Sequence, residues 1–357
     1  MQFEERLDLG EHATFVPSKS DTIYNWFYYK EGFSKQLVFW LIDKFGLKAG
    51  DTVLDTFCGS GNALLACRER GINSIGIDVL PAPLLAARVK TNSYDIEKLS
   101  EAKRSIFANR FQRPERIDVP KLMKIAFSKY AIEDIIFFKG IINRIDYPES
   151  EFFLLALINA AMRVSYTWKD GGVIKIRKRP APPLRAMFKR TAERMIKDLK
   201  KIELQKCETT IIQGDARRIE LDDESVDAII TSPPYLNNID YTKVYEIENW
   251  IASGETKPAL RSFIGIDDTE TKEKYFTDME KALKEMYRVL KPNGKVAIVV
   301  GNAFMGEKID SDILLADIAE KTGFRCEKII VLNKRAALIN RTTKIDELRE
   351  SCIILRK

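Results

Sequence analysis

The chain has 357 residues, of which 45% are hydrophobic and 31% are charged, with a formal net charge of +6. This balance is typical of a folded, water-soluble protein, and no apolar run approaches the roughly 18 residues that a membrane span needs. The five cysteines are scattered and there is one histidine, His12, which excludes the usual zinc-ligand spacings and histidine-based triads. We therefore expect a cytoplasmic protein with reduced thiols, no metal site and no membrane contact.

Strands and helices alternate over roughly the first quarter of the chain. Residues 24–29 are rich in aromatic side chains, and Ser34 is placed to cap a helix that ends at Gly46 or Gly50. The elements expected next are a strand that opens at Val53, a helix at 62–70, a strand at 74–78 and a helix at 82–92. This pattern predicts a parallel sheet covered by helices, in which a ligand binds beyond the carboxyl ends of the strands.

The turn that follows the first strand, Phe57 to Gly61, is a candidate binding element. Gly59 and Gly61 permit close ligand approach, and the next helix presents free N–H groups. Leu64 stands where a dinucleotide fingerprint needs its third glycine, which disfavours a hydride-transferring enzyme. Asp55, just before the turn, is poorly placed for a phosphate but well placed for an ammonium group. A generic strand-to-helix turn is the competing interpretation.

Acidic residues also end the second and third strands. Asp78 closes the strand at 74–78, and Asp215 follows an apolar strand that starts at Thr209. We expect Asp78 to accept hydrogen bonds from hydroxyl groups of a ligand, and Asp215, with Ala216 beside it, to accept one from an amine. Each could be a solvated loop acid if it stood alone, but three successive strand ends with acids form a stronger signal.

Residues 95–206 interrupt the alternating pattern. They predict helices at 98–111, 121–138, 151–168 and 187–202, with a loop around Gly171-Gly172. From Lys175 to Lys206 there are twelve basic and three acidic residues, whereas the rest of the chain has a small acidic excess. Such clustering indicates a polyanionic partner, although a solvated helix face is the competing interpretation. We therefore divide the chain into 1–94, a mainly helical insert at 95–206, and 207–357.

A buried strand at 226–230 leads into the tetrad Ser232-Pro233-Pro234-Tyr235. The two prolines stiffen the backbone and leave carbonyls exposed, a platform that suits a flat molecule with an amino group. Ser232 and the Pro233 carbonyl would accept hydrogen bonds from the amine, and Tyr235 would stack on the ring. These bonds would favour a more tetrahedral nitrogen and free its lone pair for attack. A rigid turn without a function is the competing interpretation.

The chain after the tetrad completes the sheet pattern. Residues 237–268 hold only a short helix around 245–251, and a loop of this length is usually functional. The further elements expected are a helix at 272–289, a turn at 291–294, a strand at 295–300, a helix at 313–322 and strands at 324–333 and 350–357.

The glycine turn, the three acids, the tetrad and the Leu290-Lys291-Pro292-Asn293-Gly294-Lys295 turn together resemble the S-adenosylmethionine-dependent amino-methyltransferases of DNA. The branch with a Ser-Pro-Pro-Tyr tetrad contains mostly cytosine-N4 enzymes, with adenine-N6 enzymes as relatives. The resemblance covers about 20–92 and 207–357. It implies an α/β fold, namely the Rossmann-like sheet of class I methyltransferases with helices on both faces.

The resemblance also implies the site residues and the partners. The catalytic residues would be Ser232, Pro233, Pro234 and Tyr235. The S-adenosylmethionine-binding residues would be Tyr29, Phe33, Ser34, Asp55, Phe57, Cys58, Gly59, Gly61, Asp78, Asp215 and Ala216. The DNA-binding residues would be Arg177, Lys178, Arg179, Arg185, Lys189, Arg190, Asn237, Asn238 and Tyr241. The partners would be duplex DNA with the target base flipped out and a cognate restriction endonuclease. The sequence indicates no oligomeric state.

Several alternatives stay open at this point. The insert lies between Asp78 and Asp215, whereas relatives with this motif order commonly carry their recognition region further on. Either 95–206 or the 237–268 loop could therefore read the target. The chemistry could act on adenine N6 or on RNA, or the fold could persist without catalysis. Cys58 as a nucleophile, in the manner of cytosine-C5 enzymes, is disfavoured because the chain has no Pro-Cys pair.

Overall fold

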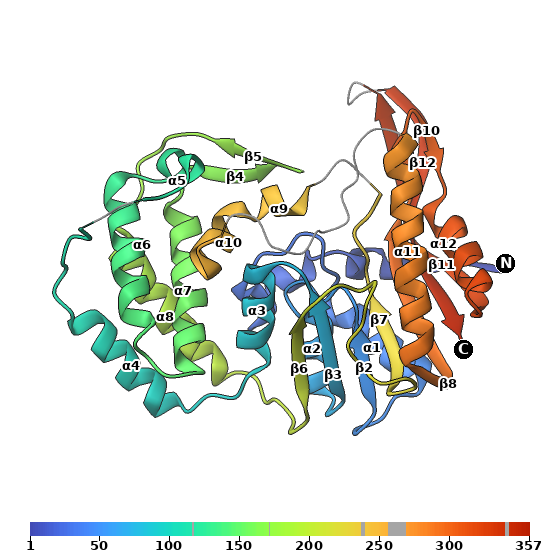
Figure 1. Cartoon of the computed structure of the whole chain (residues 1–357), viewed down its shortest axis with the longest axis horizontal. Coiled ribbons are helices and arrows are strands. Elements are labelled where there is room, and N and C mark those ends of the chain that lie inside the picture. Colours follow the sequence, from blue (N-terminus) through green and yellow to red (C-terminus); the bar gives the residue numbers. More distant parts are fainter. Residues whose placement is uncertain (116–117, 171, 237–239, 256–268, 340–342) are drawn as a thin grey trace.

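The computed structural model describes residues 1–115, 118–170, 172–236, 240–255, 269–339 and 343–357. In this part of the chain, one sheet of eight strands has the order β1-β11-β12-β8-β7-β2-β3-β6 (Figure 1). Its strands are β1 (Phe3–Glu5), β2 (Thr52–Asp55), β3 (Asn73–Asp78), β6 (Thr209–Gln213), β7 (Val226–Thr231), β8 (Leu290–Gly301), β11 (Arg325–Ile339) and β12 (Thr343–Arg356).

The sheet is mostly parallel, which confirms the predicted fold class. Neighbours among β6, β3, β2, β7 and β8 all pair in parallel. β12 runs antiparallel to both β8 and β11, and β1 pairs in parallel with β11. The chain leaves β2 toward β3 on one side, and β7 lies on the other side. The point where strand order reverses is therefore between β2 and β7, which is where ligands bind in such sheets.

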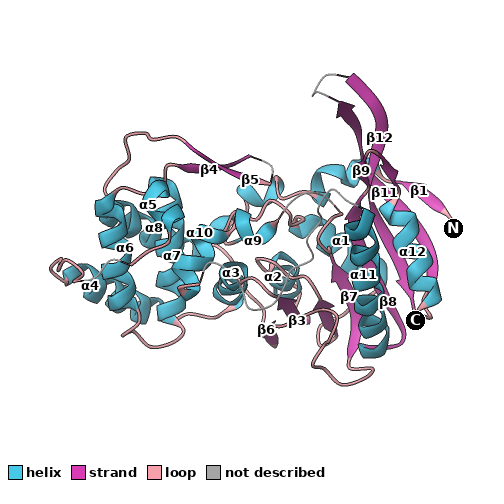
Figure 2. Cartoon of the chain, turned by 45° about the horizontal axis from the view of Figure 1, so that its top comes forward, coloured by secondary structure: helices cyan, strands magenta, loops and turns pink. Residues whose placement is uncertain are grey.

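Different helices cover the two faces of the sheet (Figure 2). They are α1 (Lys35–Phe45), α2 (Asn62–Glu69), α3 (Pro81–Thr91), α11 (Thr269–Val289) and α12 (Ser311–Lys321). Successive strand residues point to opposite faces. Val53 therefore lies in an apolar cluster with Leu37 of α1 and Ala63 of α2, whereas Leu54 lies in another with Met279 of α11. Continuous apolar runs in the central strands are thus explained by burial on both faces.

The segment 95–206 forms a helical body beside the sheet (Figure 1). Its elements are α4 (Ile96–Ala108), α5 (Lys121–Ala126), α6 (Lys129–Ile142), α7 (Glu149–Val164), the strands β4 (Thr167–Asp170) and β5 (Val173–Ile176), and α8 (Leu184–Leu199). One apolar cluster contains Phe138 and Phe188 of this body together with Leu85 of α3 and Ile251 of α10 (Glu246–Ser253). The body therefore shares its core with helices of the flanking segments.

Smaller elements surround the sheet and the cavity described below. They are the 3-10 helices η1 (Leu7–Ala13), η2 (Pro17–Lys19) and η3 (Tyr24–Trp26), the helix α9 (Tyr241–Val244), and the antiparallel pair β9 (Ala303–Met305) and β10 (Glu307–Ile309). Across the described residues, no helix combines the length and the apolar character that crossing a bilayer requires.

Two sequence predictions within the insert are wrong. The single helix predicted at 121–138 is two helices, α5 and α6, because the Ser128 hydroxyl accepts a hydrogen bond from the Ala131 N–H (3.2 Å) and caps a new start. The helix predicted at 151–168 ends at Val164, and the chain on either side of the predicted Gly171-Gly172 loop pairs as the β4–β5 hairpin.

The two last predicted strands exist but are longer than expected. β11 extends to Ile339 and β12 begins at Thr343, so together they form a long antiparallel hairpin. The helix expected around 245–251 is confirmed as α10, with the shorter α9 before it. Residues 237–239 and 256–268 of the predicted long loop lie outside the described residues.

Candidate active site

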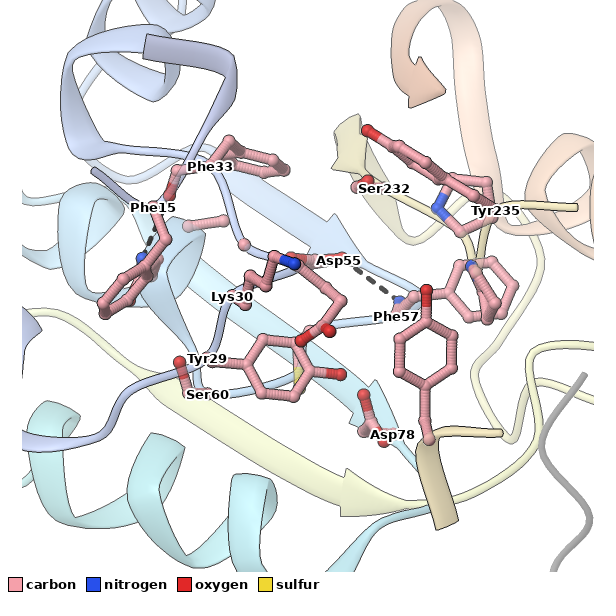
Figure 3. A pocket seen from close by; sticks show the side chains of 18 of the residues that line it. Phe15, Tyr29, Lys30, Phe33, Asp55, Phe57, Ser60, Asp78, Ser232 and Tyr235 are labelled. Carbon is pink, nitrogen blue, oxygen red and sulfur yellow. Dashed lines mark hydrogen bonds between the residues drawn. The ribbon is translucent and has the colours of Figure 1, made fainter. Parts of the chain in front are cut away.

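A cavity of about 540 Å³ opens at the carboxyl ends of β2, β3 and β7, as the switch in strand order predicts. It is lined by residues 13–16, 19, 28–33, 55–58, 60, 62–63, 78–80, 214–216, 232–235, 241, 333, 335 and 350. Figure 3 shows Ser232 and Tyr235 across the cavity from Tyr29 and Asp78, with Asp55 between them. Segments far apart in the sequence thus meet in one place, and the volume is that of a small-molecule site.

Asp55 is the most deeply buried acid of the cavity, with 3% of its surface exposed. Its Oδ1 accepts hydrogen bonds from the Thr231 hydroxyl (2.7 Å) and from the Phe57 N–H (3.1 Å). Burial raises the pKa of Asp55 to about 7, although these two bonds oppose the shift. Since Thr231 ends β7 and precedes Ser232, a hydrogen bond joins the predicted cofactor acid to the start of the tetrad.

The glycine turn brings Tyr29 against the sheet end. Gly59 (φ 48°) and Gly61 (φ 75°) have left-handed backbones that favour glycine. A Cβ at Gly59 would lie 2.5 Å from Cε1 of the Tyr29 ring, and one at Gly61 would lie 2.7 Å from the Cβ of Ala87. The two glycines are not part of the cavity lining. Instead they allow Tyr29 to cover the turn and α3 to pack closely beneath it.

Asp78 closes β3 and lines the same cavity. Its Oδ2 accepts the Gly59 N–H (2.8 Å), and its Oδ1 accepts the N–H groups of Val79 (2.7 Å) and Leu80 (3.0 Å). Burial raises the pKa of Asp78, and the three backbone bonds oppose this shift. An ionised carboxylate offers about four acceptor positions, so Asp78 keeps acceptor capacity for a ligand while the backbone fixes its orientation.

Asp215 and Ala216 also line the cavity, but the Asp215 carboxylate is tied to the protein. Arg217 Nη2 lies 2.5 Å from Asp215 Oδ2, and Arg217 Nη1 lies 2.8 Å from Asp278 Oδ2. Partial burial raises the pKa of Asp215, but the hydrogen bonds and charge of Arg217 outweigh it and lower the pKa overall. The acid at this strand end is therefore held in an ion pair at the cavity wall.

Three hydrogen bonds hold the tetrad in place. The Ser232 hydroxyl donates to the Val299 carbonyl of β8 (3.0 Å), and the Tyr275 hydroxyl donates to the Pro234 carbonyl (2.9 Å). The Tyr235 hydroxyl donates to Glu350 Oε1 (2.8 Å). Because the hydroxyl hydrogen of Ser232 is directed to a carbonyl, its oxygen presents lone pairs rather than a donor to a further partner.

Tyr235 is fixed as a neutral aromatic wall. Burial raises its pKa well above the usual value, and the charge of Glu350 adds to this shift. A Cβ at Gly301 of β8 would lie 2.9 Å from the Tyr235 ring, so the absence of a side chain there allows the ring to lie on the strand. Burial also raises the pKa of Glu350, which its bond from Tyr235 opposes.

The other predicted cofactor residues divide into two groups. Phe33, Phe57 and Cys58 line the cavity. Ser34 is buried and is not part of the lining, since its hydroxyl donates to the His12 carbonyl (3.0 Å) and fixes the turn before α1. Burial raises the pKa of the Cys58 thiol well above its usual value, which keeps it protonated and makes it a poor nucleophile.

The predicted DNA-binding residues do not form one cluster. Arg177, Lys178 and Arg179 are exposed directly after β5, and Lys189 and Arg190 are exposed on α8. None of the six predicted cations of the insert lines the cavity.

Arg185 and the residues after the tetrad differ from these. The Arg185 guanidinium donates to the carbonyls of Phe107 (2.6 Å) and Asn109 (3.1 Å) and so ties α8 to the end of α4. Tyr241 lines the cavity and is 6% exposed. Asn237 and Asn238 lie outside the described residues.

Several residues that complete the site were not predicted from the sequence. Asn333, Arg335 and Glu350 reach the cavity from the β11–β12 hairpin. Lys90 of α3 is 1% exposed, and its Nζ donates to Ser60 Oγ (3.2 Å) and Asn62 Oδ1 (3.1 Å) of the glycine turn. No local motif marks any of them, because each acts through contacts with residues distant in the sequence.

The side chains that line the cavity fit a small ligand that carries an ammonium group, hydroxyl groups and a flat ring. Asp55 and Asp78 offer acceptors, and Tyr29 and Phe33 offer aromatic surface. Among the described residues, no group of three or more His, Cys, Asp or Glu side chains is placed to hold a metal ion.

Comparison with known protein families identifies a match to a DNA methylase family. The model of a DNA methylase family, N6_N4_Mtase, matches residues 13–83 and 226–357, which together are more than half of the chain. These ranges contain the N-terminal wall of the cavity, the glycine turn, Asp78, the tetrad and the β11–β12 hairpin. They leave out the helical insert and Asp215.

Individual proteins are similar over most of the chain or over a shorter stretch of it. Type II methyltransferase M.BsoBI of Geobacillus stearothermophilus is 28% identical over an alignment that covers 90% of this chain and 82% of the relative. Type II methyltransferase M.AvaI of Anabaena variabilis is 24% identical, with 93% and 86% covered. Type II methyltransferase M.MjaII of Methanocaldococcus jannaschii is 47% identical over a stretch that covers 20% of this chain and 14% of the relative.

Two solved structures are similar to this chain at low scores. A SAM-dependent methyltransferase from Aquifex aeolicus has a TM-score of 0.33 and 13% identity, with 89% of this chain and 88% of that chain covered. A TehB-like SAM-dependent methyltransferase from Corynebacterium glutamicum has a TM-score of 0.33 and 12% identity, with 88% and 85% covered. At such scores, the fold assignment rests on the sheet order of this chain itself.

Proposed function

Since the chain belongs to the N6/N4 DNA methylase family, whose methyl donor is S-adenosylmethionine, we propose that it methylates the exocyclic N4 of a cytosine flipped out of duplex DNA. The observation that carries this proposal is the hydrogen bond from the Thr231 hydroxyl to Asp55 Oδ1 (2.7 Å). It supports the proposal because Thr231 directly precedes Ser232, and Asp55 and the tetrad line the same cavity.

Asp55 and Asp78 would hold the two polar ends of the cofactor. Asp55 would accept from the ammonium group, whose positive charge would favour the ionised carboxylate. Asp78 would accept from the ribose hydroxyls, and Tyr29 and Phe33 would enclose the bound molecule. Bound S-adenosylmethionine supplies an electrophilic methyl group on a sulfonium. Asp215, already paired with Arg217, would reach the adenine amine only with its remaining acceptor capacity.

Ser232 and Pro233 would position the target amine. The hydroxyl hydrogen of Ser232 is directed to the Val299 carbonyl, so its oxygen is available as an acceptor for one N–H of the amine. Tyr275 occupies the Pro234 carbonyl, and we therefore assign the second N–H to the Pro233 carbonyl. Two such acceptors would draw the nitrogen toward a tetrahedral geometry and direct its lone pair at the methyl group. Tyr235 would lie against the base.

DNA is the substrate that the family implies, and the depth of the tetrad supports base flipping, because a base inside a duplex cannot enter such a cavity. The exposed Arg177, Lys178 and Arg179 would contact phosphates. The names of the relatives support a restriction–modification context, with an endonuclease that cuts the same site. Such a protein would act in the cytoplasm, where it meets its DNA.

Product analysis tests the proposal. The protein is incubated with mixed-sequence DNA and labelled S-adenosylmethionine, the DNA is digested to nucleosides, and the product is identified by mass spectrometry. We expect N4-methylcytosine. N6-methyladenine would replace the cytosine assignment with the adenine one, and label that enters only RNA would overturn the DNA assignment. A Tyr235→Ala variant with full activity would contradict the assigned site.

A further inference from the structure

The β4–β5 hairpin has one face that packs on the protein and one face that is exposed to solvent. Its strands pair antiparallel as Thr167 with Ile176, Trp168 with Lys175, Lys169 with Ile174 and Asp170 with Val173. Since paired residues share a face and faces alternate along a strand, Trp168, Asp170, Val173 and Lys175 form an outer face. The opposite face carries Lys169 and Ile174.

The opposite face anchors the hairpin to the wall of the cavity. Lys169 Nζ lies 2.7 Å from Glu248 Oε1 of α10 and 3.4 Å from the centroid of the Tyr245 ring. Tyr245 stacks on Tyr29 with centroids 5.0 Å apart, and its hydroxyl donates to Glu31 Oε2 (2.6 Å). A chain of contacts therefore runs from the hairpin to the aromatic residue that covers the glycine turn.

The outer face is exposed and combines two apolar side chains with one ion pair. Trp168 is 46% exposed and Val173 is 56% exposed, while Lys175 pairs with Asp170 beside them. An indole and a branched aliphatic side chain held in solvent on a two-stranded ribbon are the kind of surface that a partner covers. The cations at 177–179 follow β5 directly, and this charge favours DNA over a protein as that partner.

The hairpin also lies beside a helix that contributes to the cavity, where the target base would bind. β5 lies against α9, and Tyr241 of α9 lines the cavity. Figures 1 and 2 show the hairpin and the outer part of the β11–β12 hairpin projecting from the same edge of the molecule, with α9 below the first. A two-stranded ribbon has the width that the major groove of B-form DNA admits.

We propose that the outer face of the β4–β5 hairpin enters the DNA beside the target nucleotide, where Trp168 and Val173 contact the unstacked bases and hold the base pair open. This inference rests on the proposed function, since it concerns how duplex DNA presents its base to the cavity. An apolar wedge of this kind lowers the free energy of the open duplex by replacing the lost base stacking.

The experiment measures base flipping apart from methylation. An oligonucleotide duplex carries the site that the wild-type protein modifies, with 2-aminopurine at the target position, whose fluorescence rises when it unstacks. We expect Trp168→Ala to reduce the fluorescence rise and to lower kcat/KM for duplex about tenfold, the size of one lost base–aromatic contact. Trp168→Phe should restore most of both signals, and Val173→Ser should show a smaller loss.

A mismatched target distinguishes a wedge from a structural role. A base opposite a mismatch is cheaper to unstack, so Trp168→Ala should methylate mismatched duplex at nearly the wild-type rate. Tyr147→Ala is the matched control, because Tyr147 is 65% exposed just before α7, at the end opposite the hairpin. It should behave as wild type in every assay.

The outcomes separate the two proposals. Equal losses on matched and mismatched duplex in Trp168→Ala, or wild-type flipping in Trp168→Ala and Val173→Ser, would overturn the wedge and leave the methyltransferase assignment intact. Wild-type protein that transfers no methyl group to any duplex would overturn the proposed function, and the wedge with it.

Discussion

Two charged side chains around the cavity are buried, whereas three that follow the β4–β5 hairpin are exposed. Around the cavity, Asp55 and Lys90 are almost fully buried, and their hydrogen-bond partners are neutral groups. On the hairpin side, Arg177, Lys178 and Arg179 stand in solvent. Desolvation of the cavity charges is therefore already complete in the folded chain, whereas the hairpin would lose its water only on meeting DNA. The cavity is preorganised for a small ligand, and the outer surface is free to adapt to a large one.

Removing the acceptor from the tetrad would give the largest effect. We expect Ser232→Ala to lower the single-turnover rate of methyl transfer by about 100-fold, a size comparable to losing one preorganised hydrogen bond at a reacting centre. The affinity for S-adenosylmethionine should stay unchanged, because Ser232 would contact only the amine. Rapid-quench measurements at saturating DNA test this. Tyr235→Phe, which keeps the ring and loses the bond from its hydroxyl to Glu350, should lose a few-fold, and a Ser232→Ala rate near wild type would contradict the mechanism.

Neutralising Asp55 should weaken the binding of S-adenosylmethionine and stabilise the cofactor-free protein. Asp55→Asn keeps an oxygen for Thr231 and Phe57 but removes the charge. We expect S-adenosylmethionine affinity to fall by about 10- to 100-fold, the range for a hydrogen bond to a charged group, as measured by calorimetry. Without cofactor, the variant should be more stable than wild type at pH 8, by up to about 4 kcal/mol for three pKa units.

The sign of the stability effect follows from proton uptake. The folded pKa of Asp55 is about 7, above the unfolded value near 3.9, so the folded state binds more protons between these two values. The contribution of Asp55 to wild-type stability therefore falls as pH rises from about 4 to 7. Urea unfolding of both proteins at pH 5 and pH 8 should show a larger advantage for Asp55→Asn at pH 8. An Asp55→Asn variant that is less stable than wild type at pH 8 would contradict the desolvation cost that distinguishes the cavity from the hairpin.

Reversing the exposed charges should act on DNA binding alone. Replacing Arg177, Lys178 and Arg179 by glutamate should weaken DNA binding. It should also reduce the slope of log K against log salt concentration by about 2 to 3, because each phosphate contact contributes about 0.9 to that slope. Fluorescence anisotropy over a salt series measures both. Arg185→Gln is the control within the same basic segment: its guanidinium binds two backbone carbonyls, so it should lower the melting temperature and leave the salt slope unchanged.

The smallest effect on activity concerns the buried lysine beneath the glycine turn. Burial lowers the pKa of Lys90 to about 7, below the unfolded value near 10.4, so the unfolded state binds more protons between these values. Wild-type stability should therefore gain from Lys90 as pH rises from about 7 to 10. Lys90→Met should be the more stable protein at pH 6, and its advantage should shrink toward pH 10.

Loss of the bonds to Ser60 and Asn62 should also raise the KM for S-adenosylmethionine a few-fold in Lys90→Met, about one hydrogen bond between neutral groups. Initial-rate assays at pH 8 measure this. An unchanged KM would show that the turn keeps its shape without the lysine, and would assign Lys90 to packing alone.

The sequence predicted the sheet edge that forms the cavity because its signals are local. Branched apolar runs marked β2, β3 and β7, and an acid or a proline pair marked their ends, so Asp55, Asp78 and Ser232 meet as parallel topology requires. The contacts of the β4–β5 hairpin were harder to predict. The Thr167–Asp170 strand has a lysine on its inward face, held by Glu248, which lies 79 positions away in the chain, and no periodicity could show that contact. The roles of Glu350 and Lys90 were hidden for the same reason.

The place where the insert joins the sheet has a consequence for building chimaeras. The chain leaves the sheet after β3 and returns at β6, and these two strands are neighbours at the sheet edge, so an exchanged insert need not disturb the register of any other strand. Yet the Asn249 Oδ1 of α10 accepts the Ala82 N–H of α3 (3.0 Å), and Arg88 of α3 pairs with Glu151 of α7 (2.8 Å). A graft between relatives should therefore carry α3 and α10 along with the helical body, because a junction at residues 94 and 206 would cut through one continuous core.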